Sequence, residues 1–353
     1  MKNQKAIRKK KRKAPNIAPS KRLVRCLAHA LCIICTICVY IPAGQEDKSS
    51  DPKYSAQVAP LPAAFDKTQP LDNLEKQIFS MADQPKLHLG AFAVEPATGR
   101  YVSVNGEETF AAASMIKVPV LVQLLDAIDK GQVSPDEILV MRKDLIGGGS
   151  GFLQWRPVDS KVSLKEAMET MIIFSDNTAT NLIIDRLGGK DVCNRAYSYW
   201  GLKHTYINNW LPDLEGTNKT SPYDLVELLA RVDKGDLLQP ESRKRMMAIM
   251  EKTRIKTLLP FGLPPGAKIA HKTGDIGSLV GDCGIIDSPE PDGKHFIACI
   301  QVSRPHNDRR ANELIRQVSR VLYAEMVPGG ASQQIAYSQA PRRRHRRHRG
   351  SSM

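Results

Sequence analysis

The chain has 353 residues, of which 42% are hydrophobic and 25% charged, and this composition excludes a wholly disordered or collagen-like protein. Its net charge of +14 comes from the two ends, because residues 1–25 hold 11 lysines and arginines, residues 327–353 hold 6 arginines, and neither end contains an acidic residue. The body between them is slightly acidic. The charge therefore gives no reason to expect a nucleic-acid partner.

Residues 26–44 follow the basic residues 1–25 and are predominantly apolar, and their first 18 residues are just long enough to span a bilayer. Lysines and arginines precede this run and acidic residues follow it, so the positive-inside rule places residues 1–25 in the cytoplasm and the later chain in the periplasm. Residues 40–44 match a cleavage site poorly, which favours an uncleaved signal anchor over a signal peptide. We expect a single-pass protein of the cell membrane.

Residues 45–70 are rich in proline, serine, alanine and charge, a composition that predicts a flexible linker. A folded domain is predicted over residues 71–326. Residues 327–353, which carry the arginine run, are predicted to form a disordered basic tail.

Hydrophobic spacing within the folded domain predicts strands on both sides of a helical middle. The predicted helices cover residues 71–82, 114–131 and 308–326, with more between 134 and 235, and the predicted strands cover 87–94, 101–104, 268–273, 279–286 and 295–301. This is an α/β, more narrowly α+β, layout: a mostly antiparallel sheet formed by the two ends of the domain, with an all-helical lobe between them. The cleft between the lobes is the expected active site.

Ser114 and Lys117 lie one helical turn apart at the start of the predicted helix 114–131, and therefore share a face. A lysine amine whose pKa is lowered by burial can take the proton of a neighbouring serine, and the helix N-terminus favours the negative charge that forms. The same spacing also arises when the serine is a helix cap and the lysine is solvated. It indicates a nucleophile only in combination with other motifs.

Two further polar motifs follow. Ser175-Asp176-Asn177 interrupts the apolar stretch 168–187, where buried polar groups need partners, although a helix N-cap also explains it. Lys272-Thr273-Gly274 ends a predicted strand. Its lysine and threonine can hold a carboxylate, and its glycine leaves room for a ligand, whereas the alternative is a lysine that protects an edge strand.

In this order the three motifs are specific, and the chain resembles the class A β-lactamase branch of the penicillin-recognising serine hydrolases over about residues 71–326. The stretch 171–181 around Ser175, the sequence Thr220-Ser221-Pro222, and Ile269-Ala270-His271 before Lys272 support this resemblance. It implies a β-lactamase/transpeptidase-like fold with the active site between the lobes.

The resemblance implies a role for each polar residue of the first two motifs. Ser114 would be the acylated nucleophile, and Lys117 its proton acceptor, directly or through water. Ser175 would pass a proton to the leaving nitrogen. Asn177 would hold Lys117 and the substrate amide.

It also implies that Lys272 and Thr273, followed by Gly274, bind the substrate carboxylate. The backbone N–H groups of Ser114 and Asp275 would form the oxyanion hole. Asp275 departs from the family, in which a small neutral residue is more common at this position, and an acid here is expected to weaken anion binding.

A second departure concerns the base that removes the acyl group. The family pattern is Trp-Glu-Pro-x-Leu-Asn, whereas residues 210–215 place Leu211 at the glutamate position and Glu215 at the asparagine position. Leucine cannot act as a base. Either Glu215 reaches the hydrolytic water from another side, or no base is present and an acyl-enzyme accumulates. A solvated loop acid is an equally good interpretation of Glu215.

These residues lead us to expect a membrane-anchored serine hydrolase in which β-lactams acylate Ser114 and are hydrolysed. The alternatives are a D,D-peptidase or transpeptidase that acts on D-alanyl cell-wall peptides, and a penicillin-binding sensor without turnover. We expect a monomer, no cofactor and no metal site, because no histidine pair or carboxylate cluster has ligand spacing. Cys193, Cys283 and Cys299 allow one disulfide or none.

Overall fold

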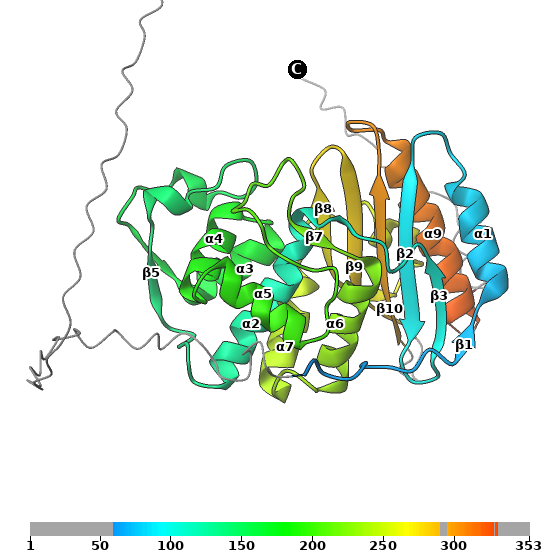
Figure 1. Cartoon of the computed structure of the whole chain (residues 1–353), viewed down its shortest axis with the longest axis horizontal. Coiled ribbons are helices and arrows are strands. Elements are labelled where there is room, and N and C mark those ends of the chain that lie inside the picture. The colour runs from blue at the N-terminus through cyan, green and yellow to red at the C-terminus, as the bar shows by residue number, and fades with distance from the viewer. Residues whose placement is uncertain (1–58, 290–294, 328, 331–353) are drawn as a thin grey trace, which may run out of the picture. The chain divides into compact units, whose positions relative to one another are not determined.

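The computed structural model describes residues 59–289, 295–327 and 329–330 (Figure 1). Its strands are β1 Gln69–Pro70, β2 His88–Glu95, β3 Arg100–Val104, β4 Phe110–Ala111, β5 Ile138–Val140, β6 Lys161–Ser163, β7 Lys219–Thr220, β8 Lys268–Asp275, β9 Leu279–Asp287 and β10 His295–Ser303. Its α-helices are α1 Asp72–Ala82, α2 Lys117–Asp129, α3 Leu164–Ile173, α4 Asn177–Arg186, α5 Lys190–Tyr199, α6 Pro222–Lys234, α7 Pro240–Met250, α8 Leu259–Gly262 and α9 Arg310–Met326.

The main sheet has the order β1-β3-β2-β10-β9-β8, and all its pairings are antiparallel except that of β1 with β3. Strands from the start of the domain thus lie directly beside strands from its end, as predicted. Because both faces of this sheet are covered, β9 and β10 are almost continuously buried and have no alternation of polar side chains.

Helices cover the two faces of the sheet differently. On one face lie α1 and α9, whose apolar sides pack on the sheet with Leu74, Ile78, Leu314 and Val318 buried (Figure 1). On the other face lies α6, which begins at the N-cap Ser221 and ends at Gly235 in the left-handed conformation. The rest of the helical lobe, including α2 to α5 and α7, extends from that side.

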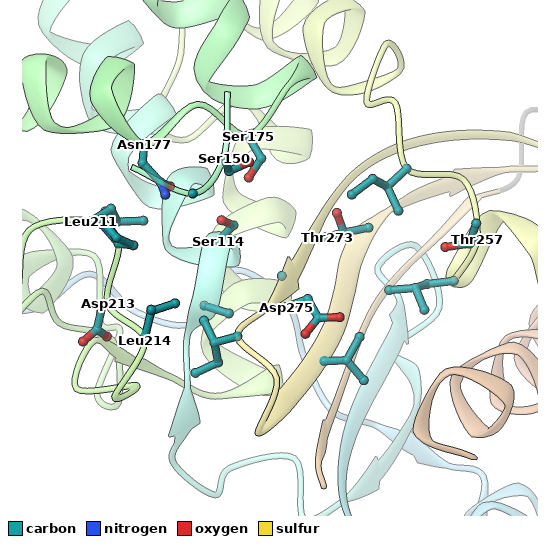
Figure 2. A pocket seen from close by; sticks show the side chains of 18 of the residues that line it. Ser114, Ser150, Ser175, Asn177, Leu211, Asp213, Leu214, Thr257, Thr273 and Asp275 are labelled. Atoms are coloured by element: carbon teal, nitrogen blue, oxygen red, sulfur yellow. The ribbon is translucent and has the colours of Figure 1, made fainter. Parts of the chain in front are cut away.

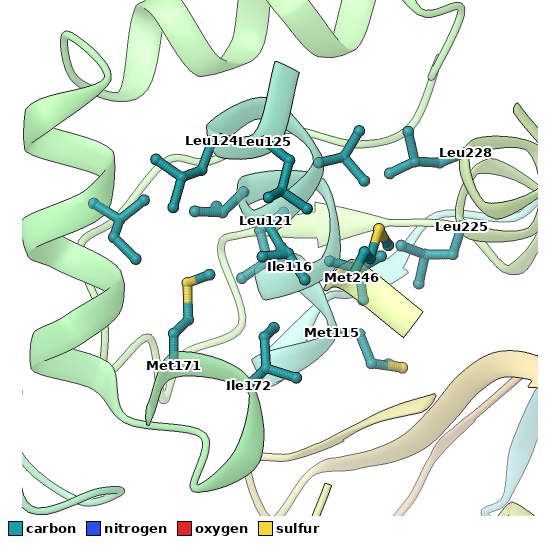
Figure 3. Close-up of a cluster of buried hydrophobic side chains, with 14 of the residues drawn as sticks. Met115, Ile116, Leu121, Leu124, Leu125, Met171, Ile172, Leu225, Leu228 and Met246 are labelled. Carbon is teal, nitrogen blue, oxygen red and sulfur yellow. The ribbon is translucent and has the colours of Figure 1, made fainter. Parts of the chain in front are cut away.

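The core of the helical lobe surrounds α2, which is buried on every side (Figure 3). Met115 and Ile116 begin this core directly after Ser114, and Leu121, Leu124 and Leu125 continue it along the helix. A helix with no solvated face has little freedom to shift. The nucleophile candidate is therefore attached to one of the most constrained elements of the fold.

Two features differ from the sequence-based expectations. Residues 59–70 are not a free linker: Ala64 and Phe65 are buried, and the Ala64 N–H donates to Glu227 Oε1 at 2.7 Å. The helical middle also contributes short strands, β5 with β6 and β7 with β4. These strands have only two or three residues, which is too short for a period-2 pattern to reveal them.

The predicted membrane segment 26–44, the predicted tail 1–25, residues 45–58 of the predicted linker and all of the predicted tail 327–353 except residues 327, 329 and 330 lie outside the described residues. Among the residues that are described, no helix combines the length and the apolar character needed to cross a membrane. Cys193, Cys283 and Cys299 are buried free thiols, so the disulfide alternative is excluded for these three cysteines.

Candidate active site

A cavity of about 320 Å³ lies between the helical lobe and β8 (Figure 2). Of the predicted site residues, six line it: Ser114, Ser175, Asn177, Thr273, Gly274 and Asp275. Lys117 and Lys272 lie beneath this surface, with at most 1% of each side chain exposed. Leu211 and Thr273 face each other across Ser114. Glu215 is not among the lining residues.

Ser114 is held in a 3-10 turn, η2 (Ala113–Ile116), that leads directly into α2. Ala113 has a φ of 46°, a left-handed conformation that costs an alanine roughly 1–3 kcal/mol and is typical of functional sites. Gly274 is required beside this turn, because a Cβ at residue 274 would lie 2.9 Å from Ala113 Cβ. The missing side chain at residue 274 thus makes room for the turn that carries Ser114.

Four oxygen atoms surround the Lys117 amine. Its Nζ lies 3.1 Å from Ser114 Oγ, 2.6 Å from the Ser175 carbonyl oxygen, 3.1 Å from Ser175 Oγ and 2.8 Å from Asn177 Oδ1. A charged amine has only three protons, so it cannot donate to all four oxygens at once. A neutral amine has a lone pair that can accept the Ser114 or Ser175 hydroxyl proton.

The electrostatics favour that neutral amine. Burial lowers the pKa of Lys117 well below its usual value, and the nearby positive charge of Lys272 lowers it further, against an opposing effect of Asp176. A lysine with a lowered pKa and a serine hydroxyl within hydrogen-bond distance form an activated nucleophile. The arrangement allows Ser114 to lose its proton directly to Lys117.

Ser175 bridges the two buried lysines. Its Oγ lies 3.1 Å from Lys117 Nζ and 3.1 Å from Lys272 Nζ. Its φ of 57° is the second left-handed non-glycine conformation in the site and turns the hydroxyl toward both amines. Burial lowers the pKa of Lys272 to about 8, although the negative charge of Asp282 opposes that effect. Ser175 is placed to relay a proton between Lys117 and the cavity.

The turn between α3 and α4 is fixed by Asp176 and Asn177. The buried Asp176 carboxylate caps α4 by accepting the Ala179 N–H, and its other oxygen accepts the Phe152 and Leu153 N–H groups. Asn177 donates to the Gly148 carbonyl at 2.7 Å. These bonds attach the segment 147–153 to the turn between α3 and α4, and Gly149 and Ser150 of that segment line the cavity.

Leu211 lies at the edge of the cavity with 5% of its surface exposed. Its backbone is clamped by one side chain: Asn181 Oδ1 accepts the Leu211 N–H at 2.9 Å, and Asn181 Nδ2 donates to the Leu211 carbonyl at 2.7 Å. The loop after it is closed by Asp213, whose carboxylate accepts the Thr217 hydroxyl and the Asn218 N–H. The side chain at residue 211 therefore has a fixed direction toward the cavity.

The structure does not bring Glu215 into this group: the residue is exposed and does not line the cavity. Arg254, another basic residue near the third motif, also lies outside the lining residues and stacks over the Phe174 ring at 5.4 Å. Sequence reasoning did not find Thr257 and Asn312, which line the cavity. Neither belongs to a recognisable motif, and only the packing of the segments that carry them places them there.

A buried polar pair lies behind the third motif. His271 and Asp282, both 0% exposed, are joined at 2.8 Å, and Asp282 also accepts the Leu259 N–H at 3.1 Å. Asp282 interrupts the apolar strand β9 opposite Thr273, and this isolated acid was a sequence signal that could have identified it. Its charge helps to keep Lys272 protonated.

The described geometry agrees with comparisons to known sequences. A model of the beta-lactamase enzyme family matches residues 73–326. A β-lactamase of Streptomyces fradiae is 30% identical over 252 residues, which cover 68% of this chain and 81% of that protein. A β-lactamase of Bacillus licheniformis is 29% identical over 277 residues, covering 75% of this chain and 86% of that protein.

Solved structures are similar over nearly their whole length. PBP-A is 48% identical with a TM-score of 0.71, covering 73% of this chain and 97% of that chain. A leucine-to-glutamate mutant of PBP-A, solved as an acyl-enzyme complex with penicillin-G, is 47% identical with a TM-score of 0.71, covering 74% and 98%. A β-lactamase from Sphaerobacter thermophilus is 25% identical with a TM-score of 0.65, covering 73% and 98%.

Proposed function

Because this chain belongs to the β-lactamase enzyme family and is a β-lactamase-like serine hydrolase, we propose that β-lactams acylate Ser114, that the ester they form is hydrolysed slowly, and that D-alanyl cell-wall peptides are the ordinary substrates. The observation that carries this proposal is Leu211, an apolar side chain at the edge of the cavity where the family has a glutamate.

Acylation uses the groups around Lys117. Ser114 Oγ attacks the amide carbonyl carbon while its proton passes to Lys117 Nζ, 3.1 Å away. The carbon–nitrogen bond then breaks, and the leaving nitrogen receives a proton from Ser175 Oγ, which is resupplied by Lys117 at the same distance. The backbone N–H groups of Ser114 and Asp275 are the proposed donors to the oxyanion. The product is an ester on Ser114.

Deacylation requires a base for the attacking water. Among the described residues, the carboxylates that line the cavity belong to Asp213 and Asp275. Both oxygens of Asp213 already accept bonds within their own loop, and Asp275 is paired with Arg304. Asp275 lies on the Thr273 side of Ser114, and Leu211 occupies the position of the family base on the other side, so no described carboxylate is placed as that base, which supports a long-lived ester.

A peptide and a β-lactam differ after acylation. When a D-alanyl peptide reacts, the terminal D-alanine departs and vacates the side of the ester near Ser175 and Lys117, so that water or an amine acceptor can enter there. When a β-lactam reacts, the leaving nitrogen stays attached through the opened ring and continues to block that side. Slow release of a β-lactam is therefore compatible with ordinary peptide turnover.

The second candidate is a true β-lactamase, which the names of the sequence relatives favour. It requires a deacylating base, and Glu215 is the residue that we propose for that role. Its exposed position calls for a movement of the loop before it could reach the ester. In that case the Glu215→Gln variant would lose penicillin turnover but would still be acylated.

The deciding measurement is intact-protein mass spectrometry of the full chain after addition of benzylpenicillin, sampled from seconds to hours. We expect an adduct of one penicillin mass that persists for hours and that Ser114→Ala does not form. A transient adduct with complete consumption of penicillin would favour the β-lactamase. The absence of any adduct would reject acylation by β-lactams altogether.

Membrane anchoring is part of the proposal and rests on the sequence of residues 1–44. We propose that residues 26–44 span the membrane and that the hydrolase domain faces the periplasm, where cell-wall peptides are found. The full chain is expected to stay with membranes washed at alkaline pH, while protease added to the periplasm degrades the domain. Release of an intact domain by washing would contradict the anchor.

A further inference from the structure

Asp275 places a fixed carboxylate inside the candidate active site. Half of its side chain is exposed, and it lines the cavity together with Ser114 and Thr273 (Figure 2). Its Oδ1 accepts the Arg304 guanidinium at 2.6 Å and the Gly277 N–H at 2.9 Å. Both bonds go to the same oxygen, so Oδ2 accepts no hydrogen bond from the described residues.

Arg304 holds this carboxylate from behind. Only 2% of its side chain is exposed, and its guanidinium also donates to the Gly277 carbonyl, the Asp308 carbonyl and Asn312 Oδ1. A guanidinium with this set of acceptors cannot turn toward a ligand without losing several hydrogen bonds. The Asp275 carboxylate is therefore the member of the pair that lines the cavity, while the Arg304 guanidinium is buried.

Asp275 lies close to the proposed carboxylate subsite. Residues 273 and 275 belong to β8 and alternate onto the same face, which places their Cα atoms about 7 Å apart. A substrate carboxylate bound at Thr273 would therefore lie within the Debye length of about 10 Å at 0.1 M salt from the Asp275 carboxylate, so that the two negative charges repel each other at low salt. The buried Lys272 amine attracts the same substrate carboxylate and opposes this repulsion.

We infer that Asp275, fixed by Arg304, is a specificity-determining residue that makes this site select ligands by charge: it disfavours those whose only charge is the carboxylate bound at Thr273 more strongly than zwitterions that carry an ammonium group as well. This inference rests on the proposed function, in which Lys272 and Thr273 receive the substrate carboxylate. It names zwitterionic acyl donors as the preferred substrate class.

The test compares Ser114 acylation rates for benzylpenicillin, which carries one negative charge, and ampicillin, which also carries an α-ammonium group. Reactions run at about pH 6.5, below the usual pKa of an α-amino group. Asp275→Asn keeps the shape and both Oδ1 hydrogen bonds but removes the charge. We expect it to react about tenfold faster with benzylpenicillin at low salt and only about threefold faster with ampicillin, a difference that 1 M salt largely removes.

Asp83→Asn is the matched control, because it removes the same unit of charge from an exposed residue at the end of α1. It should leave both rates unchanged. Asp275→Ser is a second variant of the same kind, and thermal unfolding checks that each variant is folded. Equal gains with the two penicillins, or no gain in either folded variant, would overturn the inference. Failure of the unsubstituted chain to form any adduct would instead reject the proposed function.

Discussion

Replacing Leu211 by glutamate is expected to shorten the lifetime of the penicillin ester by about 10²–10⁴-fold, the usual contribution of a well-placed general base. The fixed direction of residue 211 makes this expectation specific, because Asn181 clamps both backbone groups of that residue and directs its side chain to the edge of the cavity. A carboxylate there would face the ester from the side opposite Thr273. The measurement is the decay of the adduct after excess penicillin is removed.

Leu211→Gln is the matched control, since it has the size and polarity of the glutamate variant but cannot accept a proton at neutral pH. It should acylate and should retain a long-lived ester. If glutamate and glutamine shorten the lifetime equally, water access rather than a base limits deacylation, and the role given to position 211 is wrong.

Replacing Lys117 by methionine is expected to slow acylation of Ser114 by about 10²–10⁴-fold, because it removes the group that accepts the serine proton. Methionine matches the length of the buried lysine and should pack in its place, at the expense of donors for Asn177 and Ser175. Lys165→Met, an exposed position on α3, is the control and should react normally. Normal acylation in a folded Lys117→Met variant would show that a group other than Lys117 accepts the Ser114 proton.

The pH dependence of the acylation rate also tests proton transfer from Ser114 to Lys117. Lys117 must be neutral to take the proton, so the acylation rate should rise with pH through its lowered pKa. Lys272 must be charged to attract the carboxylate, so the rate should fall above about pH 8, where its pKa lies. Lys272→Arg, which stays charged, should move the falling limb to higher pH.

Much of the fold follows from local sequence pattern. The predicted strands and helices at both ends of the domain are confirmed within a few residues, because long buried runs and helical periodicity are strong signals. The antiparallel pairing of the two ends is also confirmed. The small two-stranded sheets were not predictable in this way because their strands are too short to show a pattern. The packing of residues 59–70 was not predictable because it depends on distant partners such as Glu227 and Tyr199.

The sequence by itself determined the chemistry that is available to this protein: a serine and a lysine one helical turn apart, two further polar motifs, and a leucine where the family has a base. The reason is that each of these facts concerns residue type and short spacing. Only the tertiary structure decided which groups meet. It placed Ser175 between two lysines that lie 58 and 97 residues away in the chain, paired Asp275 with Arg304 across 29 residues, and left Glu215 at the surface. Contacts of this length depend on how the helices of the lobe pack together and against β8, and on how the segment after β10 packs beside the β8–β9 turn, which no local pattern encodes.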